Sequence, residues 1–273
     1  MTIYSHSRLS TFETCPLKFR YKYLDRIIPA IEMSIEAHLG KSVHSALEWL
    51  YKQIKNGITP ELDQVIIVYK NEWEENWDSS IKNVKKRFTP KEYFNKGINF
   101  ILDYYMKNRP FKENTLAVEK RIVIDLDKTG KYKLQGYIDR LAYNLKTGEY
   151  EIHDYKTANN LPEPEHIEND RQLGLYSIAI KEEFGHDKEI TLIWHYLAFN
   201  RKIYSKRTPE QLKRLKEETI ELIDRIETAK NFPPKKSYLC SWCEYQAICP
   251  LWNENPPTTK EEAEKILRKE IKK

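Results

Sequence analysis

The sequence lacks the features that mark membrane proteins and repeat proteins. No run of eighteen apolar residues occurs among its 273 residues, and the first residues contain no apolar signal-peptide segment. We therefore expect a soluble, cytoplasmic protein without a membrane partner. No internal repeat and no low-complexity segment is visible. The length fits one large domain, or one domain with an insertion.

A nucleotide-binding loop is also missing. Gly40-Lys41-Ser42 resembles the end of such a loop, but the loop needs a glycine five residues before Gly40, and the residue there is Ile35. The charge is not extreme either. A formal net charge of +5 with 32% charged residues permits nucleic-acid binding without requiring it.

Two predicted strands around a turn form the most informative part of the chain. The strands, residues 133–143 and 149–157, carry recurrent apolar residues and are separated by turn residues. A tight hairpin pairs positions whose numbers sum to 293, which places Asp139 opposite Asp154. A left-handed bulge at Gly148 would shift this register by one residue and make the two carboxylates diagonal neighbours. In either register the two carboxylates meet near one strand end.

This pair of carboxylates predicts a cation site. Two carboxylates a few ångström apart do not both stay ionised unless a cation lies between them. Oxygen ligands suit Mg²⁺ or Mn²⁺, which polarise a phosphodiester and lower the pKa of a bound water. Lys156 follows on the same face and can orient water or stabilise charge on a phosphate. A surface hairpin with solvated charges is the alternative. The half-buried strand around Asp154 favours the cation site, because an unpaired carboxylate is costly there.

Two further side chains are candidates for the same site. His44 lies beside the apolar stripe of a helix predicted over residues 39–54, where a packed core histidine is the alternative to a ligand. Glu119 lies near the start of a strand predicted over residues 116–126. It reaches the site if that strand neighbours the hairpin, and a salt-bridged edge residue is an equal alternative.

A polar pair follows the hairpin. Gln172 and Tyr176 are separated by four residues in a helix predicted to begin at Arg171, so they share one helix face. The alternative is an ordinary polar pair on the surface. A further strand is predicted over residues 190–199, and a helix follows residues 201–216.

The four cysteines suggest a metal centre. Cys240, Cys243 and Cys249 form a C-x2-C-x5-C run, and Cys15 is the remaining cysteine. Four thiolates fit a tetrahedral zinc ion or an iron–sulfur cluster, and the spacing does not choose between them. Disulfides are disfavoured in a cytoplasmic protein. Four buried free thiols are a further alternative.

These motifs together resemble a known nuclease family. Asp139, followed by Asp154-Tyr155-Lys156, is similar to the core signature of the PD-(D/E)XK nucleases. The RecB-like exonuclease branch, including its CRISPR-associated members, shares several further features. These are Gly40-x-x-x-His44, Gln172-x-x-x-Tyr176, an N-terminal segment ending in Cys15-Pro16-x-Lys18-Phe19, and the three late cysteines. The resemblance covers residues 4–24, 39–54, 116–199 and 238–251.

The resemblance implies a role for each of these residues. It makes His44, Asp139 and Asp154 ligands of Mg²⁺ or Mn²⁺, with the Tyr155 carbonyl as a further ligand. It makes Lys156 the catalytic lysine. Two further roles follow from it: DNA binding by Gln172 and Tyr176, and a [4Fe–4S] cluster held by Cys15, Cys240, Cys243 and Cys249.

The predicted fold class is α/β, with a mixed central sheet of about four or five strands flanked by helices. The resemblance implies a restriction-endonuclease-like core in a single domain over residues 1–273. Within it we expect a helical insertion at 56–112, an iron–sulfur staple formed by 1–25 with 232–252, and a charged C-terminal helix at 256–273. The insertion carries basic residues that are either solvated or in contact with DNA: Lys82, Lys85, Lys86, Arg87, Lys91 and Lys96.

The implied function is metal-dependent hydrolysis of DNA. The resemblance suggests an exonuclease acting on DNA ends or single strands in repair, recombination or CRISPR adaptation, with a helicase or a CRISPR integrase as a partner. A non-catalytic DNA-binding or scaffold protein of the same fold is the alternative, although every ligand type is present. A zinc-ribbon interaction module without enzymatic activity would leave the Asp-x-Lys hairpin unexplained.

Overall fold

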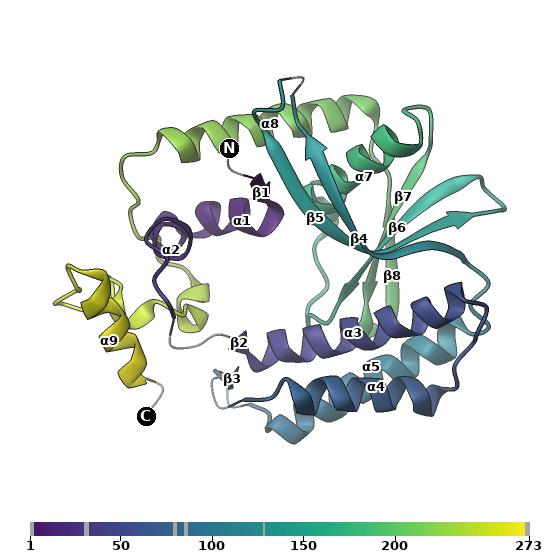
Figure 1. The fold of residues 1–273 in the computed structure, drawn as a ribbon, viewed down its shortest axis with the longest axis horizontal. Coiled ribbons are helices and arrows are strands. Elements are labelled where there is room, and N and C mark those ends of the chain that lie inside the picture. The colour runs from purple at the N-terminus through teal and green to yellow at the C-terminus, as the bar shows by residue number, and fades with distance from the viewer. Residues whose placement is uncertain (1–2, 30–32, 79–80, 85–86, 128, 271–273) are drawn as a thin grey trace.

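The protein is described by a computed structural model for residues 3–29, 33–78, 81–84, 87–127 and 129–270. Residues 1–2 and 271–273 of the predicted terminal segments, and the basic residues Lys85 and Lys86, lie outside the described residues. The described chain forms a mixed β-sheet with helical layers on both faces (Figure 1). The predicted α/β fold with a mixed central sheet is therefore confirmed.

The sheet contains six strands in the described residues. Strand β5 is central, because β4 pairs along one of its edges while β1 and β6 share the other. Strand β7 is parallel to β6, and β8 is antiparallel to β7. The predicted number of strands, four or five, was too small. The strands β1 and β8 are short, so they contain few residues from which a pattern can be detected. The strands are β1 (Ile3–Ser5), β4 (Asn114–Asp125), β5 (Lys133–Asn144), β6 (Glu149–Lys156), β7 (Ile190–Tyr196) and β8 (Arg201–Ser205).

The β5–β6 hairpin has the predicted register. Arg140 lies opposite His153, so paired positions sum to 293. Gly148 adopts a left-handed φ of 74°, but the register does not slip. Its N–H donates to the carbonyl of Asn144 at 2.8 Å and closes the turn. The ladder ends at Arg140 and His153, so the two strands separate where Asp139 and Asp154 follow.

One face of the sheet is covered by three packed helices, α3 (Ile35–Lys55), α4 (Leu62–Glu75) and α5 (Pro90–Asn108). The buried residues of α3 recur every three or four positions, as expected for an amphipathic helix. The short strands β2 (Met33–Ser34) and β3 (Ile81–Lys82) pair in parallel beside this layer. The described part of segment 56–112 thus consists mainly of α4 and α5.

The opposite face is covered by α1 (His6–Thr14), α7 (Arg171–Phe184) and the long helix α8 (Pro209–Thr228). Apolar residues of α7, α8 and the strands form one continuous core cluster on this side. The short helix α6 (Pro164–Glu168) lies in the connection between β6 and α7. Asp170 caps α7 by accepting a hydrogen bond from the N–H of Leu173 at 2.8 Å.

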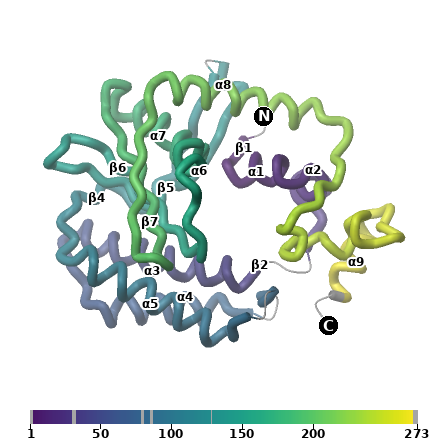
Figure 2. Tube along the Cα trace, turned by 180° about the vertical axis from the view of Figure 1, so that it is seen from behind, coloured from purple at the N-terminus to yellow at the C-terminus, as the bar shows by residue number. Residues whose placement is uncertain are grey.

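The N-terminal and C-terminal segments pack together beside the core (Figure 2). Helix α2 (Pro16–Phe19) continues into a π-helical turn and lies next to the segment that precedes α9 (Lys260–Glu270). Tyr245 donates a hydrogen bond to the carbonyl of Ile27 at 3.1 Å. These segments share a small apolar cluster made of Ile27, Tyr245, Ile248, Ala263 and Leu267.

In the described part of the chain, none of the helices combines the length and apolar character needed to cross a membrane.

Candidate active site

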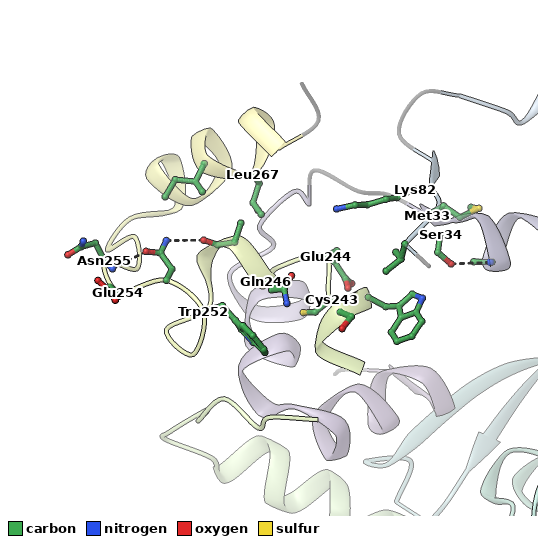
Figure 3. Close-up of a pocket in the computed structure, with 17 residues that line it drawn as sticks. Met33, Ser34, Lys82, Cys243, Glu244, Gln246, Trp252, Glu254, Asn255 and Leu267 are labelled. Carbon is green, nitrogen blue, oxygen red and sulfur yellow. Dashed lines mark hydrogen bonds between the residues drawn. The ribbon is translucent and has the colours of Figure 1, made fainter. Parts of the chain in front are cut away.

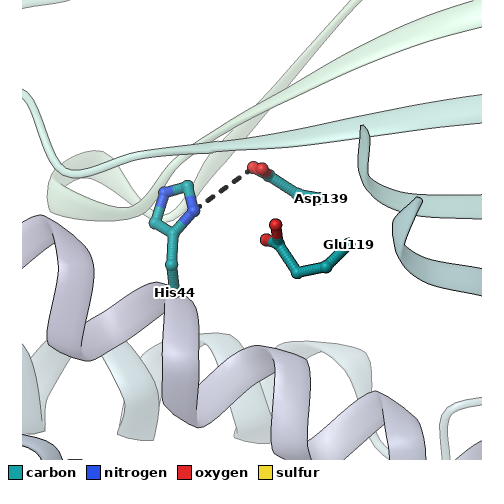
Figure 4. A group of neighbouring side chains, drawn as sticks. All are labelled: His44, Glu119 and Asp139. Carbon is teal, nitrogen blue, oxygen red and sulfur yellow. Dashed lines mark ion pairs between the residues drawn. The ribbon is translucent and has the colours of Figure 1, made fainter. Parts of the chain in front are cut away.

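Side chains from three elements converge where β5 and β6 separate. His44 comes from α3, Glu119 from β4 and Asp139 from β5, and their ligand atoms lie within 4.8 Å of one another (Figure 4). Among the described residues, no other three His, Cys, Asp or Glu side chains meet this spacing. The structure therefore brings two of the predicted metal ligands together, and places Glu119 beside them.

The backbone of Tyr155 connects these side chains. Its N–H donates to Asp139 Oδ2 at 2.8 Å, and its carbonyl oxygen lies 2.7 Å from His44 Nε2. His44 Nδ1 lies 3.5 Å from the same Asp139 oxygen. These contacts exist because the strands no longer pair with each other beyond Arg140 and His153, which frees the backbone of Tyr155.

Asp154 and Lys156 form a separate pair at the same strand end. Lys156 Nζ lies 2.7 Å from Asp154 Oδ2, and Asp154 is only 4% exposed. Asp154 does not belong to the compact group of His44, Glu119 and Asp139. It is nevertheless close enough that its charge acts on His44.

The electrostatics of the site favour a bound cation. Burial alone would lower the pKa of His44, but hydrogen bonding and the charge of Asp139 raise it to about 9. Burial raises the pKa of Asp154 to about 6, with Lys156 opposing and Asp139 adding to the shift. Burial, then Asp139 and Glu48, raise the pKa of Glu119 to about 7. Negative charge is thus more concentrated here than the side chains alone can compensate.

Glu119 reaches the site through an unusual backbone conformation. It occupies the position across from Asp139 between two paired residues of β4, and its φ is 47°. A left-handed conformation is costly for a residue other than glycine and is common at functional sites. No local sequence signal predicts this conformation.

Lys156, Gln172 and Tyr176 form a polar chain beside the carboxylates. Lys156 Nζ lies 3.4 Å from Gln172 Oε1, and Gln172 Nε2 lies 3.4 Å from the Tyr176 hydroxyl. The Tyr176 ring packs directly over Gly136 of β5, where a Cβ atom would overlap it. The glycine therefore lets α7 carry its polar pair close to the sheet.

The four cysteines lie at the contact between the terminal segments. The backbone N–H groups of Lys235 and Ser237 donate to the Sγ atoms of Cys15 and Cys240, each at 3.4 Å. Burial, with the nearby Cys15 thiol as a smaller cause, raises the pKa of Cys243 to about 11. However, no three of the sulfurs lie within 4.8 Å of one another. The predicted iron–sulfur subdomain is therefore not shown by this structure.

A cavity of about 960 Å³ lies next to this cysteine segment (Figure 3). Met33, Ser34 and Lys82 lie on one side of it, and its lining also includes residues 241–244, 246–247 and 252–255 together with Leu267 of α9. Cys243 is the only cysteine in its lining, and none of the residues that converge on His44 belongs to it. The cavity is therefore separate from the candidate active site and adjoins the cysteine segment through Cys243.

One solved structure and one family model are similar to this chain over most of its length. A crystal structure of a protein from Eubacterium rectale, named provisionally as an exonuclease, is 14% identical and has a TM-score of 0.51. The match covers 95% of this chain and 92% of that one, and shows a shared fold. The crystal structure of SSO0001 is 18% identical over 79% of this chain and 95% of that one, but its TM-score of 0.36 supports no conclusion. No curated protein sequence matches. The family model described as the PD-(D/E)XK nuclease superfamily matches residues 3–250, so the chain belongs to that superfamily.

Proposed function

We propose that this protein is a metal-dependent DNA nuclease of the RecB-like branch, acting as an exonuclease on DNA ends or single strands. The observation that carries the proposal is the convergence of His44, Asp139 and the Tyr155 carbonyl beside the Asp154–Lys156 pair. A chain of this superfamily with such a group has the parts needed for phosphodiester hydrolysis.

The donor atoms fit Mg²⁺ or Mn²⁺. His44, Asp139, Asp154 and the Tyr155 carbonyl offer one nitrogen and several hard oxygen atoms, and Glu119 adds a further carboxylate. When bound, the cation would polarise the phosphodiester and lower the pKa of a water molecule. The buried Asp154 carboxylate supports this fit, because burial raises its pKa although Lys156 lies 2.7 Å away, so a further positive charge would favour its ionised form.

The remaining residues have roles that do not require them to be ligands. The Lys156 ammonium can stabilise negative charge on the scissile phosphate, since it is held 2.7 Å from Asp154 at the edge of the site. Gln172 contacts both Lys156 and Tyr176. It can therefore position the lysine and also help to hold a DNA strand.

We also propose a [4Fe–4S] cluster at Cys15, Cys240, Cys243 and Cys249. Lys235 and Ser237 direct N–H groups at two of the sulfurs, and the Cys15 and Cys240 thiols both contribute to the raised pKa of Cys249, after burial. A single zinc ion with bonds near 2.3 Å would need sulfurs about 3.8 Å apart. The spacing of the cysteines along the chain fits zinc or iron alike, and the choice of a cluster rests on the resemblance to RecB-like nucleases. The cellular role we propose is DNA repair, recombination or CRISPR adaptation, beside a helicase or an integrase.

The test is cleavage of end-labelled single-stranded and double-stranded DNA with Mg²⁺, with Mn²⁺ and with a chelator. We expect cleavage only with metal, and at least a hundredfold loss in Asp154→Asn. Asp187→Asn is the matched control, because Asp187 is an exposed carboxylate that pairs with Lys188 outside the candidate site. Equal cleavage by a folded Asp154→Asn variant would exclude the site. Salt-dependent DNA binding by the parent without any cleavage would favour the non-catalytic scaffold instead.

A further inference from the structure

Two fully buried charged or polar residues adjoin the site carboxylates along the chain. Arg140 follows Asp139, and His153 precedes Asp154, with exposures of 0% and 1%. They lie opposite each other as the last pair of the β5–β6 ladder. Because side chains alternate along a strand, both point away from the carboxylates, toward the layer of α3 and α5.

Arg140 makes a fork of contacts in this layer. Its Nη1 donates to Glu113 Oε2 at 2.9 Å, and its Nη2 donates to His153 Nδ1 at 2.8 Å. Its guanidinium carbon lies 4.0 Å from the centre of the Tyr51 ring, which is a favourable cation–π distance. Lys202 Nζ lies 3.5 Å from the other oxygen of Glu113.

These contacts determine the form of His153. Arginine only donates hydrogen bonds, so His153 Nδ1 must be an acceptor and carries no proton. His195 Nε2 lies 2.8 Å from the same nitrogen, so it is the donor of that contact. His153 Nε2 then holds the proton and faces Glu151 Oε2 at 3.3 Å. Burial, and then the charges of Arg140 and Lys202, lower the pKa of His153 well below its ordinary value, in agreement with a neutral ring.

A chain of hydroxyl groups leads from the same layer to the site. The Tyr51 and Tyr104 hydroxyls are 2.7 Å apart, and the Tyr104 and Tyr155 hydroxyls are 3.2 Å apart. The backbone of Tyr155 contacts both His44 and Asp139. Tyr155 therefore joins the buried layer, through its side chain, to the site, through its backbone. We call this set the buried network: Glu113, Arg140, His153, His195, Tyr51, Tyr104 and Tyr155.

The ionic character of the buried network is not explained by stability alone. Replacing buried ionic groups by well-packed apolar residues is often neutral or stabilising, because desolvation offsets the attraction between the charges. The hydrogen bonds of Arg140 to Glu113 and His153 fix the orientations of the guanidinium and the ring, although Arg140 Nε and His153 Nε2 make no hydrogen bond within the described residues. Here the oriented parts are the strand ends that carry Asp139, Asp154 and the Tyr155 carbonyl.

We propose that the buried network positions the Tyr155 carbonyl and the two flanking carboxylates for cation binding. Its members do not touch the cation or the DNA, except through the backbone of Tyr155, so they are positioning residues. This inference rests on the proposed function, because it concerns the same site.

The experiment measures Mn²⁺ affinity by calorimetry on the full chain, together with the unfolding temperature. Tyr155→Phe removes only the hydroxyl. Arg140→Lys keeps the charge but loses the fork that joins Glu113 to His153. We expect Mn²⁺ to bind about tenfold or more weakly to each variant, the range found when partners of metal ligands are removed. Tyr105→Phe is the matched control, because it removes a buried hydroxyl that donates to Pro60 at 2.8 Å in the same helical layer.

The outcomes separate the two proposals. Failure of the parent protein to bind Mn²⁺ would overturn the proposed function, and this inference with it. Parent-like Mn²⁺ affinity in folded Tyr155→Phe would overturn the positioning role alone. An equal affinity loss in Tyr105→Phe would also overturn it, since the effect would then follow stability. If Arg140→Lys does not fold, Tyr155→Phe still decides.

Discussion

At the scale of single residues, the contact between Asp154 and Lys156 joins a proposed metal ligand to a proposed catalytic lysine. Asp154 offers oxygen atoms to a cation, while the ammonium of Lys156 can only donate hydrogen bonds. Their distance of 2.7 Å means that the charge of one sets the pKa of the other. A substitution at either residue therefore affects the site differently.

We predict that Lys156→Ala abolishes DNA cleavage but retains Mn²⁺ binding. The loss in cleavage rate should be about a hundredfold or more, as found when a group that stabilises transition-state charge is removed. Mn²⁺ should bind at least as tightly, because Asp154 loses a competing positive charge. Cleavage assays and calorimetry on the same protein check this. Lys188→Ala, which removes a lysine outside the candidate site, is the control. Loss of Mn²⁺ binding in a folded Lys156→Ala variant would contradict the assigned roles.

A second prediction concerns pH. The pKa of His44 is raised from its ordinary 6.5 to about 9 in the folded protein. Protonation of His44 therefore stabilises the fold fully at pH values below 6.5, and this contribution is lost as the pH rises through 9. The pKa values of Asp154 and Glu119 are also raised, to about 6 and about 7. The folded protein therefore loses stability as the pH rises from the ordinary values of these groups to the raised ones. Without metal, the unfolding temperature should fall from pH 5 to pH 9.

Added Mn²⁺ should reverse this trend. A cation binds the deprotonated forms of all three groups, so it competes with protons. The rise in unfolding temperature caused by Mn²⁺ should therefore be larger at pH 8 than at pH 6, as measured by differential scanning calorimetry. A larger rise at pH 6 would show that these groups do not bind the cation.

At the scale of elements, the contact between β5 and α7 places the polar chain of Lys156, Gln172 and Tyr176. Gly136 is the point of closest approach, because the Tyr176 ring occupies the space of a side chain there. Gly174 of α7 similarly leaves room for Leu215 of α8. Glycines thus set how closely α7 approaches its neighbours on two sides.

We predict that Gly136→Ala destabilises the protein by about 1–3 kcal/mol, the usual cost of overpacking. It should also reduce DNA cleavage, because Tyr176 and Gln172 must move away from Lys156. Tyr176→Leu removes part of the overlapping ring, so its cost and that of Gly136→Ala should not add in the double variant. Denaturant unfolding of the four proteins measures this coupling. Strictly additive costs would mean that the ring adapts without strain.

At the scale of the whole molecule, the two terminal segments are tied together beside the core. Lys18 Nζ lies 2.6 Å from Glu244, and the N–H of Leu17 donates to the carbonyl of Pro233. A metal centre shared by Cys15 and Cys240 would close a loop of more than two hundred residues. In the loop-entropy model such a closure stabilises the fold by about 5 kcal/mol.

We predict that anaerobically purified protein contains iron and sulfide, and that Cys243→Ala loses both together with several degrees of unfolding temperature. Cleavage activity should fall only in proportion to the unfolded fraction, because the cysteines are remote from His44. Iron and sulfide analysis, a visible spectrum and thermal unfolding check this. Stoichiometric zinc without colour would exclude the cluster but keep the tie between the termini. Unchanged stability of Cys243→Ala would exclude both.

The sequence by itself determined the parts of the site that lie within one local pattern. The meeting of Asp139 and Asp154 near one strand end follows from strand periodicity and turn residues close together in the chain, in either of the two registers that the turn allows, and the structure shows the unshifted one. The helix that carries His44 and the shared face of Gln172 and Tyr176 follow from helical spacing. Each of these depends on contacts between near neighbours, which residue patterns express directly.

Only the tertiary structure decided how these parts meet. The contact of His44 with the Tyr155 carbonyl joins residues 111 positions apart. Glu119 enters the site through a left-handed φ that no local rule favours for glutamate. Arg140 and His153 are buried charged or polar residues whose partners Glu113 and His195 come from other segments of the chain. Such contacts depend on packing between elements, because burial strengthens a polar interaction only after distant segments have excluded water from it.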